Sequence, residues 1–208
     1  MVRTVRSDWR WVRSSLWAAA VAGLLAGCQG TPDRSGGPGA FPRPKLVVAI
    51  LVDGLGQHQV SKYREQFGPG GFRRFLEDGA WFEDARYGHS TTITAVGHGT
   101  WLTGAYPYRH GMISNEWYDR KTKKTVYCTE DPSHHYLGEP TKEHQGTSPK
   151  NLQVTTVGDE LRAATSMKSR VFAVSLKDRG AILPAGRLGT SYFYSPETGR
   201  FITSDFYL

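Results

Sequence analysis

The sequence predicts an α/β fold, a doubly wound and mostly parallel sheet with a β-hairpin near the C-terminus. Two apolar, β-branched runs carry this prediction: LVVAILV at residues 46–52 and RVFAVSL at residues 170–176. Continuous runs of this kind are typical of strands that are buried on both faces of a parallel sheet and therefore need helical cover. Segments with helical spacing lie between the two runs, so that strands and helices alternate along the chain.

The first run is followed by two predicted helices and a second strand. Residues 59–67 and 71–78 have helical spacing of their apolar side chains, and Gly79 stands where a helix would end. Residues 80–85 then return to a pattern that predicts a strand.

The second half repeats the alternation. Residues 157–165 predict a short helix before the 170–176 strand, and residues 192–194 and 201–203 flank SPETGR, a turn-rich signal for a hairpin. The chain stops at Leu208 directly after an aromatic, strand-like run, without a capping helix or a polar tail. This ending predicts that the chain is the N-terminal portion of a longer protein.

Composition limits the possible classes of protein. The 208 residues are 38% hydrophobic, which suits one globular domain and excludes a long disordered chain. The formal charge is +7, but the cations beyond the first segment are spread out, with no basic helix and no ladder of aromatic and basic residues. A nucleic-acid partner is therefore not expected.

Residues 1–27 have the order of a bacterial export signal. Four arginines precede the apolar stretch at residues 16–25, which is too short to span a membrane stably. The stretch ends in Leu-Ala-Gly-Cys, which resembles the bacterial lipoprotein box, and Cys28 would then be the acylated first residue of the mature protein. The alternative is a signal for soluble secretion in which this cysteine is incidental.

Residues 28–44 are rich in Gly, Pro and Ser and predict a flexible tether, which leaves residues 45–208 as the folded domain. Gln29 resembles the outer-membrane sorting pattern, so the predicted location is the periplasm, with a lipid anchor in the outer membrane. If Cys28 is lipidated, Cys128 has no disulfide partner in the chain. Its place in the alternating segment KTVYCTED favours a half-buried structural cysteine over a reactive thiol.

Candidate chemistry begins at the carboxyl end of the first run, where open α/β sheets bind their ligands. Asp53 follows LVVAILV directly and precedes Gly54 and Gly56. Its carboxylate could ligate a metal or cap the next helix, and Asp53 alone does not decide between the two.

The segment STTITAVGHGT, residues 90–100, offers hydroxyl groups at a loop that leads into a helix. A hydroxyl there could act as a nucleophile that is stabilised by the helix N-terminus, provided that a metal or a strong base lies near it. His98 is the available base, but a packing or orienting imidazole is favoured, because a metal-activated nucleophile needs no histidine.

Two further segments suggest phosphate binding. Lys177 and Arg179 follow the 170–176 strand and could clamp phosphate oxygens, or they could form a solvated basic turn. Asn115 could donate from its amide to a phosphoryl oxygen, or it could be an ordinary loop residue.

Three segments of the sequence together resemble the alkaline phosphatase superfamily. They are VVAILVDGL, GPGGFRRFLEDGAWFEDARYGHSTTITAVGHGTWLTGAYPYRHGMISNEWYDR and VSLKDRGAILPAG. The resemblance covers most of residues 45–207 and is to the threonine-nucleophile bacterial alkaline phosphatases related to nucleotide pyrophosphatase/phosphodiesterases. It implies that Asp53 is a zinc ligand and that Thr94 is the nucleophile and a ligand of the same zinc. It also implies that Asn115, Lys177 and Arg179 bind the phosphoryl group of a small-molecule phosphate ester.

This resemblance implies hydrolysis of phosphate monoesters through a phosphothreonine, with two zinc ions in the complete enzyme. The family's remaining metal ligands, an Asp-x-x-x-His pair and others, lie in its C-terminal half. Asp131 and His135 have this spacing, but their polar segment predicts a surface loop. Two alternatives remain open. The protein could be a phosphodiesterase or nucleotide pyrophosphatase, or it could be a non-catalytic, truncated lipoprotein that binds phosphate. The sequence does not indicate an oligomeric state.

Overall fold

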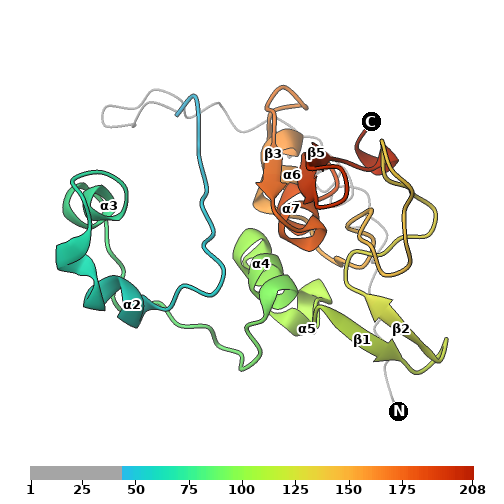
Figure 1. The fold of residues 1–208 in the computed structure, drawn as a ribbon, viewed down its shortest axis with the longest axis horizontal. Helices are drawn as coiled ribbons and strands as arrows, with labels where there is room; N and C mark the ends of the chain where they lie inside the picture. Colours follow the sequence, from blue (N-terminus) through green and yellow to red (C-terminus); the bar gives the residue numbers. More distant parts are fainter. Residues whose placement is uncertain (1–43) are drawn as a thin grey trace, which may run out of the picture. The chain divides into compact units, whose positions relative to one another are not determined.

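The computed structural model describes residues 44–208, and the chain divides into two units, residues 1–49 and residues 50–208 (Figure 1). The predicted export signal, Cys28 and nearly all of the predicted tether lie outside the described residues. None of the described helices has the length and the apolar character that crossing a membrane requires.

The second unit contains short helices and strands in an irregular alternation. In chain order they are α2 Gln57–Lys62, η2 Arg64–Gln66, α3 Phe72–Asp78, α4 Thr94–Thr103, α5 Pro107–His110, β1 Glu116–Asp119, β2 Lys124–Tyr127, α6 Val157–Ala164, β3 Phe172–Ser175, α7 Asp178–Ala185, β4 Thr190–Ser195, β5 Arg200–Ile202 and η3 Asp205–Tyr207.

A three-stranded sheet in the order β3-β4-β5 forms the C-terminal part. Strands β3 and β4 are parallel, with Phe172 opposite Thr190, and α7 connects them and packs on both. This is the βαβ unit that the α/β prediction requires. Strands β4 and β5 pair antiparallel around a turn in which Gly199 has φ +67°, which confirms the predicted hairpin.

Several other predicted elements are present. Helices α2 and α3 occupy the two segments predicted to be helical after the first apolar run, and Gly79 is the C-cap of α3. Helix α6 ends within one residue of its predicted end. Strand β2 begins the KTVYCTED segment and pairs with β1 in an antiparallel hairpin.

Two predicted strands, at residues 46–52 and 80–85, were wrong. Neither segment pairs with a strand within residues 44–208, and their side chains are exposed, as Leu46 at 77% and Phe82 at 79% show. An apolar, β-branched run forms a strand only where a neighbouring strand satisfies its backbone N–H and C=O groups. The composition of these runs was therefore insufficient to predict their conformation.

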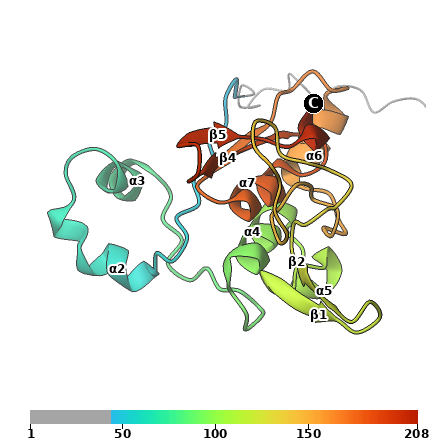
Figure 2. The ribbon, with the colours of Figure 1, turned by 45° about the vertical axis from the view of Figure 1, so that its right-hand side comes forward.

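The core of the described part surrounds α7. One buried cluster joins α7 to α4 and to the end of β2, and its members are Ala95, Met112, Tyr127, Cys128, Leu152 and Leu183. A second cluster joins α7 to the sheet, and its members are Tyr136, Ala181, Ile182, Phe193 and Ile202. Helix α4 lies against α7 in both views (Figures 1 and 2).

The segment between β2 and α6 corrects another prediction. It is irregular, as expected, but it is not simply a surface loop, because Asp131, Thr147 and Ser148 are buried. The Asp131 carboxylate accepts hydrogen bonds from Ser133 Oγ and Ser148 Oγ, each at 2.7 Å. Burial alone would raise the pKa of Asp131, but these hydrogen bonds and one from Lys150 outweigh burial and lower the pKa.

Buried Asp159 fixes the start of α6 and the chain that follows α7. Its Oδ2 accepts from the backbone N–H of Thr156 at 2.9 Å. Its Oδ1 accepts from the N–H groups of Arg187 at 2.9 Å and Leu188 at 2.7 Å. Thr156 Oγ1 accepts in return from the N–H of Asp159, which completes a capping box. One carboxylate therefore satisfies three N–H groups from two parts of the chain.

We predict that Asp159→Ala lowers the free energy of unfolding by about 3 kcal/mol, because it leaves these N–H groups without an acceptor. Urea denaturation of the chain measures the change. Glu160→Ala is the control, since Glu160 is the next residue of α6 and is exposed, and its effect should stay within about 0.5 kcal/mol. Equal effects of the two substitutions would contradict the role of Asp159.

Candidate active site

A hydrogen bond joins the first two sequence-predicted site residues, although 41 positions separate them. Thr94 is the first residue of α4, and its Oγ1 donates to Asp53 Oδ2 at 2.8 Å. The Asp53 side chain is exposed and Thr94 is half-buried, so the pair is accessible from solvent. The geometry places a threonine oxygen against a carboxylate at a helix N-terminus, where the helix dipole favours negative charge.

Asn115 completes the first turn of α4. Its Oδ1 accepts from the backbone N–H of Ala95 at 2.9 Å. The residue before the helix, Ile93, has no side chain that can cap it, so Asn115 takes over this task from a distant loop. With Oδ1 turned to the helix, the Nδ2 donors of Asn115 have no hydrogen-bond partner within residues 44–208.

His98 lies one turn further along α4 and serves its own helix. Its Nδ1 contacts the carbonyl oxygen of Thr94 at 2.8 Å, and the side chain is buried. Because a carbonyl only accepts, Nδ1 is the donor in this contact. The imidazole therefore contacts the Thr94 backbone rather than its hydroxyl, in agreement with the predicted packing role.

Lys177 and Arg179 lie at the start of α7. Lys177 is the N-cap residue and its side chain is exposed, whereas Arg179 is half-buried and donates from Nη1 to Tyr127 Oη at 2.9 Å. A Cβ built on Gly180, the next residue of α7, would lie 3.8 Å from His98 Nε2. The first turn of α7 therefore lies beside the second turn of α4.

The structure thus forms two groups from the five predicted residues. Asp53, Thr94 and Asn115 belong to one hydrogen-bonded group at α4, and the two cations belong to α7, which packs on α4. No hydrogen bond or ion pair joins the two groups within the described part of the chain.

The sequence analysis missed the polar residues that hold Arg179. Asp178 Oδ1 accepts from Tyr127 Oη at 2.6 Å, and Asp178 Oδ2 accepts from the N–H of Gly146 at 2.6 Å. Asp178 lies between the two predicted phosphate-binding cations, and Tyr127 lies in the alternating segment KTVYCTED. No pattern along the sequence marks a contact between residues 51 positions apart.

Few residues of the described part could hold a metal ion. Residues 44–208 contain no group of three or more His, Cys, Asp and Glu side chains with suitable placement. Asp53 and Thr94 offer two adjacent oxygen donors, a chemistry that suits part of a divalent metal site. The Asp131 carboxylate instead accepts hydrogen bonds from Ser133, Ser148 and Lys150, so its oxygens already have partners.

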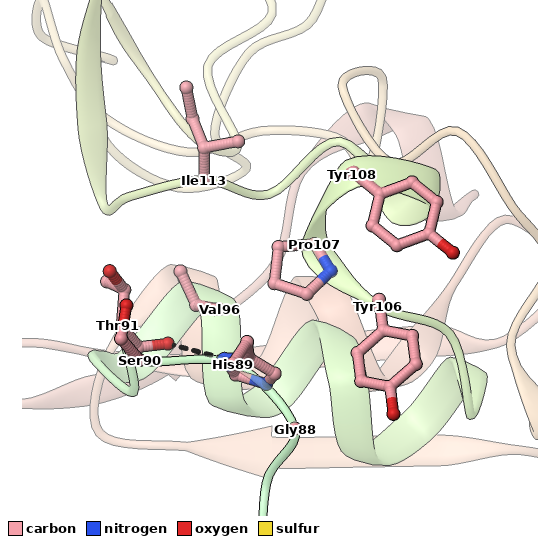
Figure 3. Close-up of a pocket in the computed structure, with 9 residues that line it drawn as sticks. All are labelled: Gly88, His89, Ser90, Thr91, Val96, Tyr106, Pro107, Tyr108 and Ile113. Carbon is pink, nitrogen blue, oxygen red and sulfur yellow. Dashed lines mark hydrogen bonds between the residues drawn. The ribbon is translucent and has the colours of Figure 1, made fainter.

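The sequence analysis also did not find a pocket of about 460 Å³ beside the loop that leads to Thr94 (Figure 3). The rings of Tyr106 and Tyr108 stack at its wall, with centroids 6.0 Å apart. The full lining is Gly88, His89, Ser90, Thr91, Val96, Tyr106, Pro107, Tyr108 and Ile113. Its wall is thus mainly apolar and aromatic.

The comparison with protein families agrees with this arrangement. A model of the type I phosphodiesterase / nucleotide pyrophosphatase family matches residues 47–181, well over half of the chain. The chain belongs to this family.

Several proteins similar to this chain are named as alkaline phosphatases. The chain is 42% identical over 169 residues to alkaline phosphatase PafA of Elizabethkingia meningoseptica, covering 81% of this chain and 31% of that protein. It is 42% identical over 176 residues to alkaline phosphatase PhoV of Synechococcus elongatus, covering 82% and 32%. The chain therefore spans about a third of the length of these relatives.

The fold is shared as well. The crystal structure of wild-type PafA matches with a TM-score of 0.77 at 42% identity, over 81% of this chain and 32% of that one. A second PafA structure, with a TM-score of 0.76 at 39% identity, covers 81% and 33%. The α/β prediction and the resemblance to alkaline phosphatases are confirmed.

The second PafA structure is a variant with four substitutions. A threonine is replaced by serine, and an asparagine, a lysine and an arginine are each replaced by alanine. Those positions have the same residue types and the same spacing along the chain as Thr94, Asn115, Lys177 and Arg179.

Cys128 is a free, fully buried cysteine next to this site. Burial raises the pKa of its thiol to about 12, and the charge of Asp178 adds to the shift. The prediction of a structural cysteine is confirmed, and the side chain is more deeply buried than expected.

We predict that Cys128 resists alkylation in the folded protein. At about pH 8 an unfolded cysteine is partly thiolate, whereas the raised pKa keeps Cys128 neutral, and only the thiolate is the nucleophile. In a chain with Cys28→Ser, iodoacetamide labelling followed by mass spectrometry should be at least about 100-fold slower than in concentrated urea. Similar rates in both conditions would contradict the burial of this thiol.

Proposed function

We propose that this chain carries the nucleophile and the phosphoryl-binding groups of a metal-dependent phosphate monoester hydrolase that acts through a phosphothreonine at Thr94. The observation that carries the proposal is the hydrogen bond from Thr94 Oγ1 to Asp53 Oδ2 at the N-terminus of α4. Family membership, the names of the relatives and the matching residue types in the PafA variant support it.

In this reaction the Thr94 oxygen forms a bond to phosphorus while the ester P–O bond breaks, and the alcohol leaves with the proton from the threonine hydroxyl. Water then attacks the phosphothreonine, which releases inorganic phosphate and restores the Thr94 hydroxyl.

A threonine hydroxyl ionises too weakly at neutral pH to attack phosphorus unaided, but the α4 N-terminus stabilises the developing negative charge and Asp53 orients the oxygen. A divalent metal bound to Asp53 and Thr94, which we propose to be zinc, would add the positive charge that favours the alkoxide. Two donors are half of the ligands that zinc usually has, so residues 44–208 hold part of such a site. A second zinc belongs to the same proposal.

The phosphoryl oxygens would be bound by the remaining site residues. Asn115 offers its free Nδ2 donors beside Thr94, and Lys177 and Arg179 offer positive charge from the neighbouring helix. A monoester carries a dianionic phosphoryl group and a diester a monoanionic one, so two cations favour the monoester. This preference separates the proposal from a phosphodiesterase function.

We predict that Lys177→Ala lowers kcat/KM for a phosphate monoester by about 10- to 100-fold, the size expected for a lost hydrogen bond between charged groups. Turnover of the matching diester should fall by less than about threefold, because it presents one negative charge fewer. The measurement uses aryl phosphate and bis-aryl phosphate with the protein as its gene encodes it.

Lys168→Ala is the matched control, because Lys168 is also exposed and lies outside the site. It should leave both activities unchanged. Equal losses of monoester and diester turnover in Lys177→Ala would contradict the monoesterase assignment.

We also propose that the protein is a lipoprotein of the bacterial envelope, exported by residues 1–27 and anchored through Cys28 to the periplasmic face of the outer membrane. The arginine-rich start, the short apolar run and the Leu-Ala-Gly-Cys box support this location.

We predict that Cys28→Ser abolishes incorporation of palmitate into the protein, because serine has no thiol that can be acylated. Labelling with radioactive palmitate in a Gram-negative host, followed by immunoprecipitation, measures the incorporation. Gln29→Ala is the neighbouring control and should keep the label. Undiminished labelling of the Cys28→Ser protein would contradict the lipid anchor at Cys28.

A further inference from the structure

We propose that the Tyr127 hydroxyl is a positioning group that holds the Arg179 guanidinium in place for a phosphoryl oxygen. The inference rests on the proposed function, since it assigns Tyr127 to the same site. Within the described residues Tyr127 makes no hydrogen bond to Thr94 or Asp53, and it would act only through Arg179.

The hydrogen-bond directions at Tyr127 follow from its partners. Its Oη lies 2.6 Å from Asp178 Oδ1 and 2.9 Å from Arg179 Nη1. A carboxylate only accepts and a guanidinium only donates, so the hydroxyl donates to Asp178 and accepts from Arg179. Tyr127 therefore bridges the carboxylate and the guanidinium.

The Asp178 carboxylate that anchors this bridge is itself fixed. Oδ2 accepts from the N–H of Gly146 at 2.6 Å, and Oδ1 also accepts from the N–H of Arg179 at 2.6 Å. Both carboxylate oxygens thus accept from an N–H group and a tyrosine hydroxyl, since Tyr136 Oη also donates to Oδ2 at 3.5 Å. Within residues 44–208 no carboxylate forms an ion pair with the Arg179 guanidinium at 4.0 Å or less. The charge of Arg179 is therefore not neutralised by direct contact.

The guanidinium keeps donors for another ligand. Nη1 donates to Tyr127 and Nε is buried, whereas Nη2 is not among the buried atoms and makes no hydrogen bond within residues 44–208. A flexible arginine side chain loses rotamer entropy when it is held in one conformation, and a ligand must otherwise offset that loss when it binds. A hydroxyl that already holds Nη1 reduces this loss.

Tyr127 is suited to a permanent role of this kind. It is the last residue of β2, its ring is buried in the cluster that includes Cys128 and Leu183, and Arg179 lies over its ring at 5.9 Å. Burial raises the pKa of Tyr127, and the charge of Asp178 raises it further. The hydroxyl therefore remains protonated, and a donor to Asp178, at neutral pH.

The test removes only the hydroxyl. Tyr127→Phe keeps the buried ring, and in the gene-encoded protein kcat/KM for an aryl phosphate should fall about tenfold, a typical effect of one lost hydrogen bond to a charged group. In an Arg179→Ala background the same substitution should have no further effect, because its action passes through Arg179.

Tyr207→Phe is the matched control. Tyr207 Oη also contacts α7 and its C-cap, at the carbonyl oxygens of Ile182 and Gly186, both at 3.4 Å, but within the described residues it makes no hydrogen bond with Arg179 or Asp178. Its loss should leave kcat/KM unchanged in either background.

A spectroscopic readout separates this inference from the proposed function. In protein labelled with ¹⁵N-arginine, the Arg179 guanidinium resonances, identified by their absence in Arg179→Ala, should show slow rotation in the parent and fast averaging in Tyr127→Phe. Failure of the parent to hydrolyse the monoester would reject the proposed function, while the resonances would still report on positioning. Unchanged Arg179 resonances in Tyr127→Phe, or an equal loss of activity with and without Arg179, would overturn the positioning role.

Discussion

The burial of α7 is the constraint on which the rest of the described structure depends. Its residues from Gly180 to Leu183, together with Ala185, are inaccessible, and they contribute to both core clusters. A helix that is apolar on nearly all sides must be covered on all of them, here by α4, by the sheet and by the irregular segment after β2. Because α7 cannot move without opening both clusters, the start of the helix is fixed as well. Lys177 and Arg179 lie at that start, on a helix that packs against α4.

The irregular segment is part of this cover rather than an appendage. It carries the backbone N–H that binds Asp178, and its own carboxylate, Asp131, is satisfied by serine hydroxyls and a lysine. Buried polar groups must find partners, and a segment without regular secondary structure finds them in side chains. This explains how a polar sequence that predicts a surface loop becomes buried at both of its ends.

Local patterns predicted the elements that local contacts stabilise. Helices α2, α3 and α6 follow from apolar spacing and capping, and β3 forms because α7 returns the chain to pair it with β4. Residues 46–52 have an equally strong strand composition but no neighbouring strand to pair with in residues 44–208, and composition alone does not supply a partner.

The site residues divide in the same way into those that local sequence predicts and those that only a distant contact identifies. Asp53, Thr94 and Lys177 could be nominated from their places next to apolar runs and hydroxyl-rich turns, whereas Tyr127 and Asp178 are linked only by a contact across the fold.

The central claim is that Thr94, and no other hydroxyl of its segment, takes the phosphoryl group. The most direct measurement is to quench the gene-encoded protein with acid during turnover of an aryl phosphate and to locate the modified residue by peptide mass spectrometry. We expect the phosphoryl group on Thr94, the only hydroxyl among residues 90–94 that the described structure bonds to Asp53. A phosphoryl group on Ser90, Thr91 or Thr92, or turnover without any phosphorylated residue, would contradict the claim.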